Sequence, residues 1–294
     1  MKGAKLVLIE NTLKELFRDK YGDFNLDRLT GGYTNETFLL TSESHPPLVI
    51  KLANTFNIDI ENEINCLKLT QETGVTPKVY DVIKKDNHQI MVMEYKNGRN
   101  GQTILDNKEL DRAKELYKSL GESLAKSIHS KKYNGAAGIR VCNFNELNFN
   151  LDFVPEHLIS SSKEILRGIK DSQEEWVLTH GDYGVHNVLF TNSNTLTILD
   201  WEWAEWANPL TDISWVCWFT KIHYPQYAET LIPLFMEEYK KHNPIQLSSQ
   251  SLKGYSVYKV WNVLHKVEKA PKEVQAEWVR RLKWTVENDL FSYL

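Results

Sequence analysis

Short apolar runs separated by polar turns characterise the first hundred residues of the chain. The segments 26–29, 38–40, 48–52 and 90–94 are rich in leucine, isoleucine, valine and phenylalanine and are too short for helices. Runs of this length between turn-forming residues predict β-strands. Residues 59–72 instead show helical spacing and end just before a glycine. The pattern predicts a strand-rich front part with one main helix.

Two further patterns define the predicted helices. Thr12 and Glu15 have the spacing of a capping box, which predicts a short helix that begins there and runs to about residue 20. Residues 108–130 carry leucines and an isoleucine near helical spacing, and long helices dominate the remainder. The change falls at a segment rich in glycine and asparagine. We therefore predict an α+β protein with two lobes, residues 1–97 and 98–294.

A polar loop between two apolar runs is the most informative segment of the chain. Apolar residues at 177–178 and 188–190 flank the loop 180–187, and a further apolar run returns at 196–199 after a turn. This arrangement predicts a β-hairpin with the polar loop at its open end.

The hairpin predicts which polar side chains of this region meet. If Phe190 faces Thr195, Asp182, Asn187 and Asp200 converge on one small volume. Three oxygen-bearing side chains so placed can hold Mg²⁺ and orient a hydroxyl group for attack on a phosphate. His180, Asp182 and His186 also form the pattern His-x-Asp-x3-His. A zinc or two-metal hydrolase therefore stays open as an alternative.

The front part contains a candidate ion pair. Lys51 lies in the middle of an apolar strand, where it is either exposed at an edge or directed into a polar cleft. Glu63 falls within the apolar stripe of the next helix and needs a partner there. Lys51 is the natural partner, and Glu61 is the alternative acid but lies further from the stripe.

Two weaker signals accompany this pair. Gly31 and Gly32, followed by Asn35, lie between two predicted strands. Glycines there let the backbone approach a phosphate, although an isolated pair of glycines is more often a plain hairpin turn. The motif lacks the Lys-Ser/Thr ending of a Walker loop. Glu94 and Tyr95 end the last front strand, which is either a buried strand or a segment that binds a nucleotide base.

The composition excludes several classes of protein. The hydrophobic fraction is 41%, the charged fraction 25% and the formal net charge −4, which gives no support to nucleic-acid binding. Three widely spaced cysteines argue against a disulfide scaffold and suggest a reducing compartment. No run is long enough for a membrane span. We expect a cytoplasmic protein with no nucleic-acid, membrane or obligate protein partner.

The motifs together resemble the aminoglycoside phosphotransferase and choline kinase family, which has the protein-kinase-like fold. The resemblance runs from about Leu29 to Asp212 and rests mainly on His180 to Phe190 and Leu199 to Trp201. It implies an N-terminal nucleotide-binding lobe with an antiparallel sheet and one key helix, and a larger, mainly helical catalytic and substrate-binding lobe.

The resemblance also implies roles for the candidate residues. Asp182 is the catalytic base, Asn187 and Asp200 are the metal ligands, and Lys51 with Glu63 positions the nucleotide phosphates. The co-substrate is ATP or GTP with Mg²⁺. Gly31, Gly32, Asn35, Glu94 and Tyr95 complete the predicted nucleotide site, while His180 and Asp212 support the loop. A plain helix cap is the alternative for Asp212.

By this resemblance the acceptor is set by the region after residue 200, which here is rich in tryptophan and acidic residues. Most of these tryptophans are expected in the core, but aromatic faces with carboxylates suit a cationic acceptor. Glu202 and Glu205 are the predicted substrate contacts, and an aminoglycoside-like hydroxyl substrate is the leading interpretation. Choline or ethanolamine, a macrolide and a homoserine-type metabolite are the alternatives, and a catalytically silent nucleotide-binding protein is a remote one.

Overall fold

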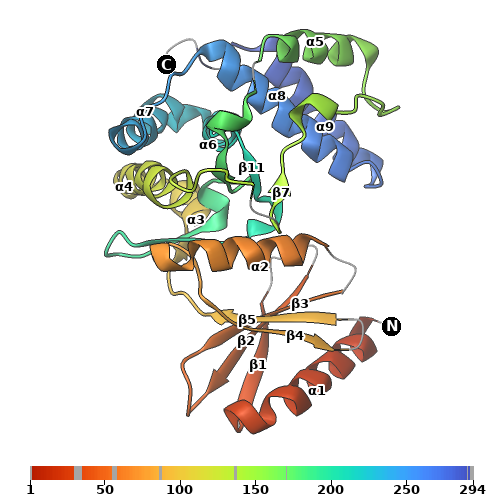
Figure 1. Cartoon of the computed structure of the whole chain (residues 1–294), viewed down its shortest axis with the longest axis vertical. Helices are drawn as coiled ribbons and strands as arrows, with labels where there is room; N and C mark the ends of the chain where they lie inside the picture. Colours follow the sequence, from red (N-terminus) through yellow and green to blue (C-terminus); the bar gives the residue numbers. More distant parts are fainter. Residues whose placement is uncertain are drawn as a thin grey trace. The chain divides into compact units, whose positions relative to one another are not determined.

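The computed structural model describes residues 2–29, 35–54, 58–85, 88–135, 138–169, 171–289 and 291. The chain divides into two compact units, Met1–Asn97 and Gly98–Leu294. The first contains an antiparallel sheet and the second is mainly helical, which confirms the predicted α+β class (Figure 1).

The N-terminal unit is built on a five-stranded antiparallel sheet with the strand order β1-β2-β3-β5-β4. Figure 1 shows helices α1 and α2 on opposite sides of this sheet. The elements are α1 (Lys2–Tyr21), β1 (Phe24–Leu29), β2 (Glu36–Ser42), β3 (Leu48–Asn54), α2 (Ile58–Thr70), β4 (Val79–Lys85) and β5 (His88–Glu94).

Strand alternation decides what each face of the sheet carries. Phe38, Ile50 and Val92 lie in adjacent strands and pack with Leu13 and Phe17 of α1 in one buried cluster. Successive side chains point to opposite faces, so the residue after Ile50 lies on the α2 side. The apolar stripe of α2 is buried against this face of the sheet. Lys51 of β3 and Glu63 of α2 therefore lie in the same desolvated layer.

Three details of this unit differ from the sequence expectations or refine them. The first helix begins at Lys2 rather than at a capping box, because residues 2–11 hold no proline and continue the helix through Thr12; the predicted start was wrong. Strand β4 was not predicted. The end of α2 was predicted correctly: a short 3-10 turn leads to Gly74, which ends it in the left-handed conformation at φ 77°.

The C-terminal unit combines seven α-helices, within its described part, with two small three-stranded sheets, β10-β9-β6 and β7-β11-β8. Its elements are β6 (Arg99–Asn100), α3 (Gly101–Asp106), α4 (Leu110–Ser123), β7 (Arg140–Val141), α5 (Glu156–Arg167), β8 (Val177–Thr179), β9 (Val188–Phe190), β10 (Leu196–Ile198), β11 (Glu205–Ala207), α6 (Leu210–His223), α7 (Pro225–His242), α8 (Ser249–Lys266) and α9 (Lys272–Glu287).

Helix packing forms the core of this unit. Helix α4 lies so close to α7 that a Cβ on Gly121 would be 2.2 Å from the carbonyl oxygen of Phe235. Trp201, Trp218 and Trp261 are fully buried, so much of the tryptophan content fills the core as expected. Among the helices of the described chain, none is long and apolar enough to span a membrane.

The predicted hairpin of this unit is present, with a register one residue away from the prediction. Phe190 pairs with Leu196 rather than with Thr195, because the turn runs from Thr191 to Thr195 and places Asn194 at φ 63°. The N–H of Leu199 donates to the carbonyl of Asn187 at 2.8 Å. The shift leaves Asp200 one residue beyond the partner of Asn187.

Candidate active site

The loop 180–187 connects β8 to β9 and is fastened by one buried carboxylate. Asp212 lies in the first turn of α6 and accepts the N–H of His180 at 2.7 Å on Oδ2 and the N–H of Gly181 at 2.8 Å on Oδ1. His129 lies 3.2 Å from the same carboxylate through Nε2. The helix itself receives no side-chain cap, so Asp212 holds the loop and does not cap α6.

The His180 ring is engaged on both nitrogens. Its Nδ1 accepts the N–H of Asp182 at 3.3 Å, and its Nε2 donates to the carbonyl of Leu199 at 2.9 Å. Burial lowers the pKa of this imidazole, so the ring stays neutral. A ring committed in this way cannot ligate zinc. No group of three or more His, Cys, Asp and Glu in the described chain is arranged to hold a metal.

Gly181 is required by the path of the loop. Its φ is 77°, and a Cβ at this position would lie 2.1 Å from the carbonyl oxygen of Trp203. Only glycine combines this backbone conformation with so close an approach. The contact seats the loop against the segment that leads into β11.

Asp182 is the carboxylate of the loop, and three side chains contact it. Trp215 donates its Nε1 to Oδ1 at 2.7 Å, Asn187 donates its Nδ2 to Oδ2 at 2.9 Å, and His186 Nε2 lies 3.2 Å from Oδ2. Burial opposes ionisation, but the hydrogen bond and charge of His186, the charge of Lys259 and the Trp215 bond together lower the pKa of Asp182 to about 2. Its side chain is 30% exposed, so an ionised carboxylate reaches the surface.

Two partners of Asp182 were not predicted as site residues. Trp215 lies three residues after Asp212 on α6, and this spacing places both on one face of the helix. That spacing was a usable signal. His186 stacks on Phe219 with ring centroids 4.5 Å apart, a contact that no local pattern announces.

The oxygen donors near Asp182 suit a hard divalent cation. Asn187 uses its Nδ2 for two hydrogen bonds to Asp182, to the backbone oxygen and to Oδ2, which directs its Oδ1 elsewhere. Asp200 lies two residues after the end of β10 and is exposed, in the left-handed conformation at φ 62°. An amide oxygen and a carboxylate are ligands that Mg²⁺ accepts, so the residues present fit this ion.

The N-terminal unit brings its predicted pair together. Lys51 of β3 donates its Nζ to Glu63 Oε2 of α2 at 2.6 Å, and both side chains are buried. The alternative acid Glu61 is exposed. A charge-assisted bond of this length in a desolvated layer fixes the lysine ammonium relative to the sheet.

The weaker nucleotide-site candidates are only partly described. Gly31 and Gly32 lie outside the described residues. Asn35 is buried immediately before β2. Glu94 ends β5, where its Oε1 accepts Lys96 and its N–H donates to the carbonyl of Lys78. Tyr95 follows and is half-buried.

A cleft of about 510 Å³ opens in the C-terminal unit, and its lining includes none of the residues 180–187. Strands β7 and β11 and helix α8 form its walls. Glu205 lines it, whereas Glu202 is not among the described residues that do. Burial raises the pKa of Glu205 to about 7, against the opposing charges of Lys259 and Arg140. Trp203 and Lys259 also line the cleft and were not predicted.

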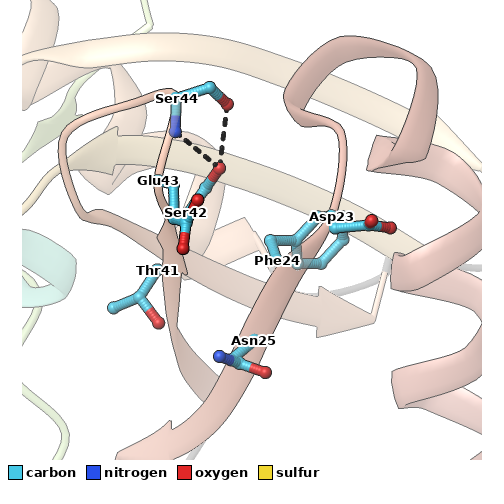
Figure 2. Close-up of a pocket in the computed structure, with 7 residues that line it drawn as sticks. All are labelled: Asp23, Phe24, Asn25, Thr41, Ser42, Glu43 and Ser44. Atoms are coloured by element: carbon cyan, nitrogen blue, oxygen red, sulfur yellow. Dashed lines mark hydrogen bonds between the residues drawn. The ribbon is translucent and has the colours of Figure 1, made fainter.

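A second hollow, of about 590 Å³, lies at the ends of β1 and β2 in the N-terminal unit and contains none of the predicted site residues (Figure 2). The hydroxyls of Ser42 and Ser44 are 2.9 Å apart, and both lie within hydrogen-bond distance of the backbone oxygen of Tyr21. Both hydroxyls therefore have hydrogen-bond partners within the protein.

The fold and the site together define a phosphotransferase. A family model described as the phosphotransferase enzyme family matches residues 25–239, about three quarters of the chain. The chain therefore belongs to this family, whose members transfer phosphate to hydroxyl groups, and the predicted resemblance is confirmed. No curated protein matches the chain by sequence.

Solved structures of low sequence identity have the same fold. Amicoumacin kinase hAmiN in complex with AMP-PNP, Ca²⁺ and Ami is 13% identical, with a TM-score of 0.69 over 93% of this chain and 92% of that one. Spectinomycin phosphotransferase APH(9)-Ia with ADP and spectinomycin is 18% identical, with a TM-score of 0.68 over 96% and 97%. Choline kinase LicA from Streptococcus pneumoniae is 16% identical, with a TM-score of 0.70 over 95% and 98%.

Proposed function

We propose that the protein transfers the γ-phosphate of ATP, in the presence of Mg²⁺, to the hydroxyl group of a small molecule. The observation that carries this proposal is the ionised carboxylate of Asp182, held by Trp215 and Asn187 on a loop that also presents oxygen donors for a cation. AMP-PNP and ADP in the solved relatives support an adenine nucleotide as the donor, and GTP remains an arm of the test.

Asp182 takes the proton in the proposed reaction. Its Oδ1 accepts one hydrogen bond and its Oδ2 accepts contacts from two residues, so Oδ1 keeps a lone pair for the acceptor hydroxyl. As the oxygen of the acceptor hydroxyl bonds to the γ-phosphorus, the hydroxyl proton passes to Asp182. The bond between the γ-phosphorus and the β-phosphate oxygen breaks, which releases ADP. A positioned base of this kind is typically worth about 10²–10⁴ in rate.

The other candidate residues position the donor. Lys51, fixed by Glu63, binds the nucleotide phosphates, and Asn187 with Asp200 holds Mg²⁺, which neutralises phosphate charge. Asn35 and the backbone of Glu94 and Tyr95 are assigned to nucleotide binding, as are Gly31 and Gly32. His180 and Asp212 keep the loop in shape.

The acceptor predicted from the sequence is an aminoglycoside-like cation, and the spectinomycin and amicoumacin kinases of similar fold support it. The charge of the cleft points elsewhere. Arg140, Lys259 and Lys266 line it together with Glu146 and Glu205, and a polycation gains little from such a wall. The charge of the cleft therefore does not favour the predicted aminoglycoside-like acceptor.

The test is a coupled assay of ADP or GDP release with Mg²⁺, run across antibiotics, choline, ethanolamine and hydroxy acids. We expect acceptor-dependent release that Asp182→Ala lowers by about 10²–10⁴ and that Asp200→Ala also abolishes. Asp111→Ala is the matched control, because Asp111 is an exposed aspartate on α4.

Three outcomes would contradict the proposal in different ways. Full turnover in both variants would make the site assignment wrong. Nucleotide binding, seen as a thermal shift, without turnover on any acceptor would favour a silent nucleotide-binding protein. Bound zinc with hydrolysis that needs no nucleotide would favour the metallohydrolase.

A further inference from the structure

The cleft lined by Lys259 carries more basic than acidic side chains. Arg140 of β7 and Lys259 and Lys266 of α8 line it, against Glu146 and Glu205. The pKa of Glu205 is raised to about 7 by burial, so its negative charge is incomplete at neutral pH. The wall therefore carries three basic and two acidic side chains, with burial lowering the pKa of Lys259 as well, whereas the chain as a whole has a formal net charge of −4.

Lys259 is the most unusual of these residues. It is 2% exposed, yet no hydrogen bond or ion pair reaches its ammonium from any residue that the structure describes. Its Nζ instead lies 4.6 Å from the ring centre of Trp203 and 5.7 Å from that of Trp215. A buried ammonium normally requires a hydrogen-bonding partner. Three N–H donors directed at a cleft point to a ligand that accepts them.

The aromatic surface of the cleft is already used by cations. Besides Lys259, the Nζ of Lys266 lies 4.8 Å from the ring centre of Trp203. The π-face of an indole is what binds a quaternary ammonium or a protonated amine. A cationic acceptor would have to displace these lysines and would face their repulsion, whereas an anion would be attracted to both.

We propose that the acceptor carries an anionic group, a carboxylate or a phosphate, which binds the ammonium of Lys259 in this cleft while its hydroxyl reaches Asp182. This inference rests on the proposed phosphotransferase function. Trp215 sets the spacing, because its ring lies beside Lys259 and its Nε1 donates to Asp182 at 2.7 Å. The volume of about 510 Å³ suits a small molecule.

The experiment compares acceptors of different charge on the full chain with Mg²⁺ and ATP. The carboxylate arm uses glycerate, the phosphate arm glycerol 3-phosphate, and the comparison arms glycerol, ethanolamine, choline, kanamycin and the zwitterion homoserine. We expect the highest kcat/KM in one anionic arm, which also distinguishes carboxylate from phosphate. Lys259→Met should lower that kcat/KM about 10- to 100-fold through KM, with the KM of ATP unchanged.

Lys253→Met provides the matched control. Lys253 lies on the same helix but donates to the backbone oxygen of Asn288 and does not line the cleft, so this variant should behave as the wild type. The best turnover on a neutral or cationic alcohol, unaffected by Lys259→Met, would overturn the inference and leave phosphoryl transfer intact. Absence of nucleotide binding would instead contradict the proposed function.

A binding measurement decides the matter if none of these alcohols is phosphorylated. Tryptophan fluorescence reports on Trp203 and Trp215, which lie beside Lys259. With AMP-PNP and Mg²⁺ present, glycerate or glycerol 3-phosphate should change the emission in the wild type and not in Lys259→Met. An equal response in both proteins, or a response to choline alone, would overturn the inference.

Discussion

Two buried lysines, one in each unit, are stabilised in opposite ways. Lys51 in β3 is 9% exposed and donates to Glu63 at 2.6 Å. Lys259 in α8 is 2% exposed, and its Nζ lies 4.6 Å and 5.7 Å from the ring centres of Trp203 and Trp215. The first charge is neutralised by the protein itself. The second is held by aromatic rings and keeps its hydrogen-bond donors.

The difference separates a charge that the fold requires from one that the fold tolerates. Removal of one member of a buried ion pair leaves the other desolvated and uncompensated. Replacement of Lys259 by an apolar side chain of similar length breaks no such ion pair, although it removes a charge that lowers the pKa of Asp182 and of Glu205. We therefore expect variants of the Lys51–Glu63 pair to lose more stability, and variants of Lys259 and its surroundings to lose more activity.

The largest stability effect is expected for Glu63→Ala. This change leaves the Lys51 ammonium buried without its carboxylate, which should lower the free energy of unfolding by about 3–5 kcal/mol. Urea denaturation at neutral pH measures it. The double variant Lys51→Met with Glu63→Leu should recover most of the loss, because it removes both charges together. A loss below about 1 kcal/mol in the single variant would show that the pair is not a structural element.

The Lys51–Glu63 contact was predictable because both halves of it are local. Strand alternation gave the side of the sheet, and the spacing of Glu63 within an apolar stripe gave the side of the helix. The loop 180–187 was equally predictable in outline, since a hairpin restricts where its polar residues lie. Its register was wrong by one residue because Asn194 lengthens the turn.

The surroundings of Lys259 were not predictable from such patterns. Helix α8 is buried over most of its surface, so its periodicity does not single out one lysine. The cleft arises where β11 pairs with β7, from segments more than sixty residues apart in the sequence. Contacts of that separation depend on tertiary packing, which neither spacing nor composition encodes.

Glu205, a carboxylate near Lys259, should give the next largest effect on stability. Burial raises the pKa of Glu205 from 4.5 to about 7, while Lys259 and Arg140 oppose the shift. The folded state then binds the proton more tightly than the unfolded state. This contribution to stability is complete below pH 4.5 and is lost as the pH rises through about 7, up to about 3 kcal/mol.

Denaturation at a series of pH values tests this expectation. The free energy of unfolding of the wild type should fall between pH 4.5 and 7 relative to that of Glu205→Gln. Lys259→Met should move the wild-type transition to higher pH, because the lysine charge favours the ionised carboxylate. Parallel pH profiles for the wild type and Glu205→Gln would contradict the raised pKa.

Trp215 lies between Lys259 and the carboxylate of Asp182. Trp215→Phe should have an intermediate effect, and on activity. The variant keeps an aromatic ring near Lys259 but loses the hydrogen bond to Asp182 Oδ1. A hydrogen bond to a charged group is worth about 1.5–3 kcal/mol, so kcat should fall about 10- to 100-fold with the KM of the nucleotide unchanged. Trp218→Phe is the control, because its indole donates to Thr285 instead. An equal loss in both variants would indicate general damage to the stacked tryptophans.

The smallest stability effect is expected for Lys259→Met, in contrast to Glu63→Ala. Burial lowers the pKa of Lys259, against the attraction of Glu205 and Asp182, so the fold gains little from keeping the charge. Methionine fills a similar volume and packs well against indole rings. The free energy of unfolding should change by less than about 1 kcal/mol. Thermal denaturation beside Lys253→Met measures the difference. A loss as large as that of Glu63→Ala would mean that Lys259 serves the fold, as Lys51 does.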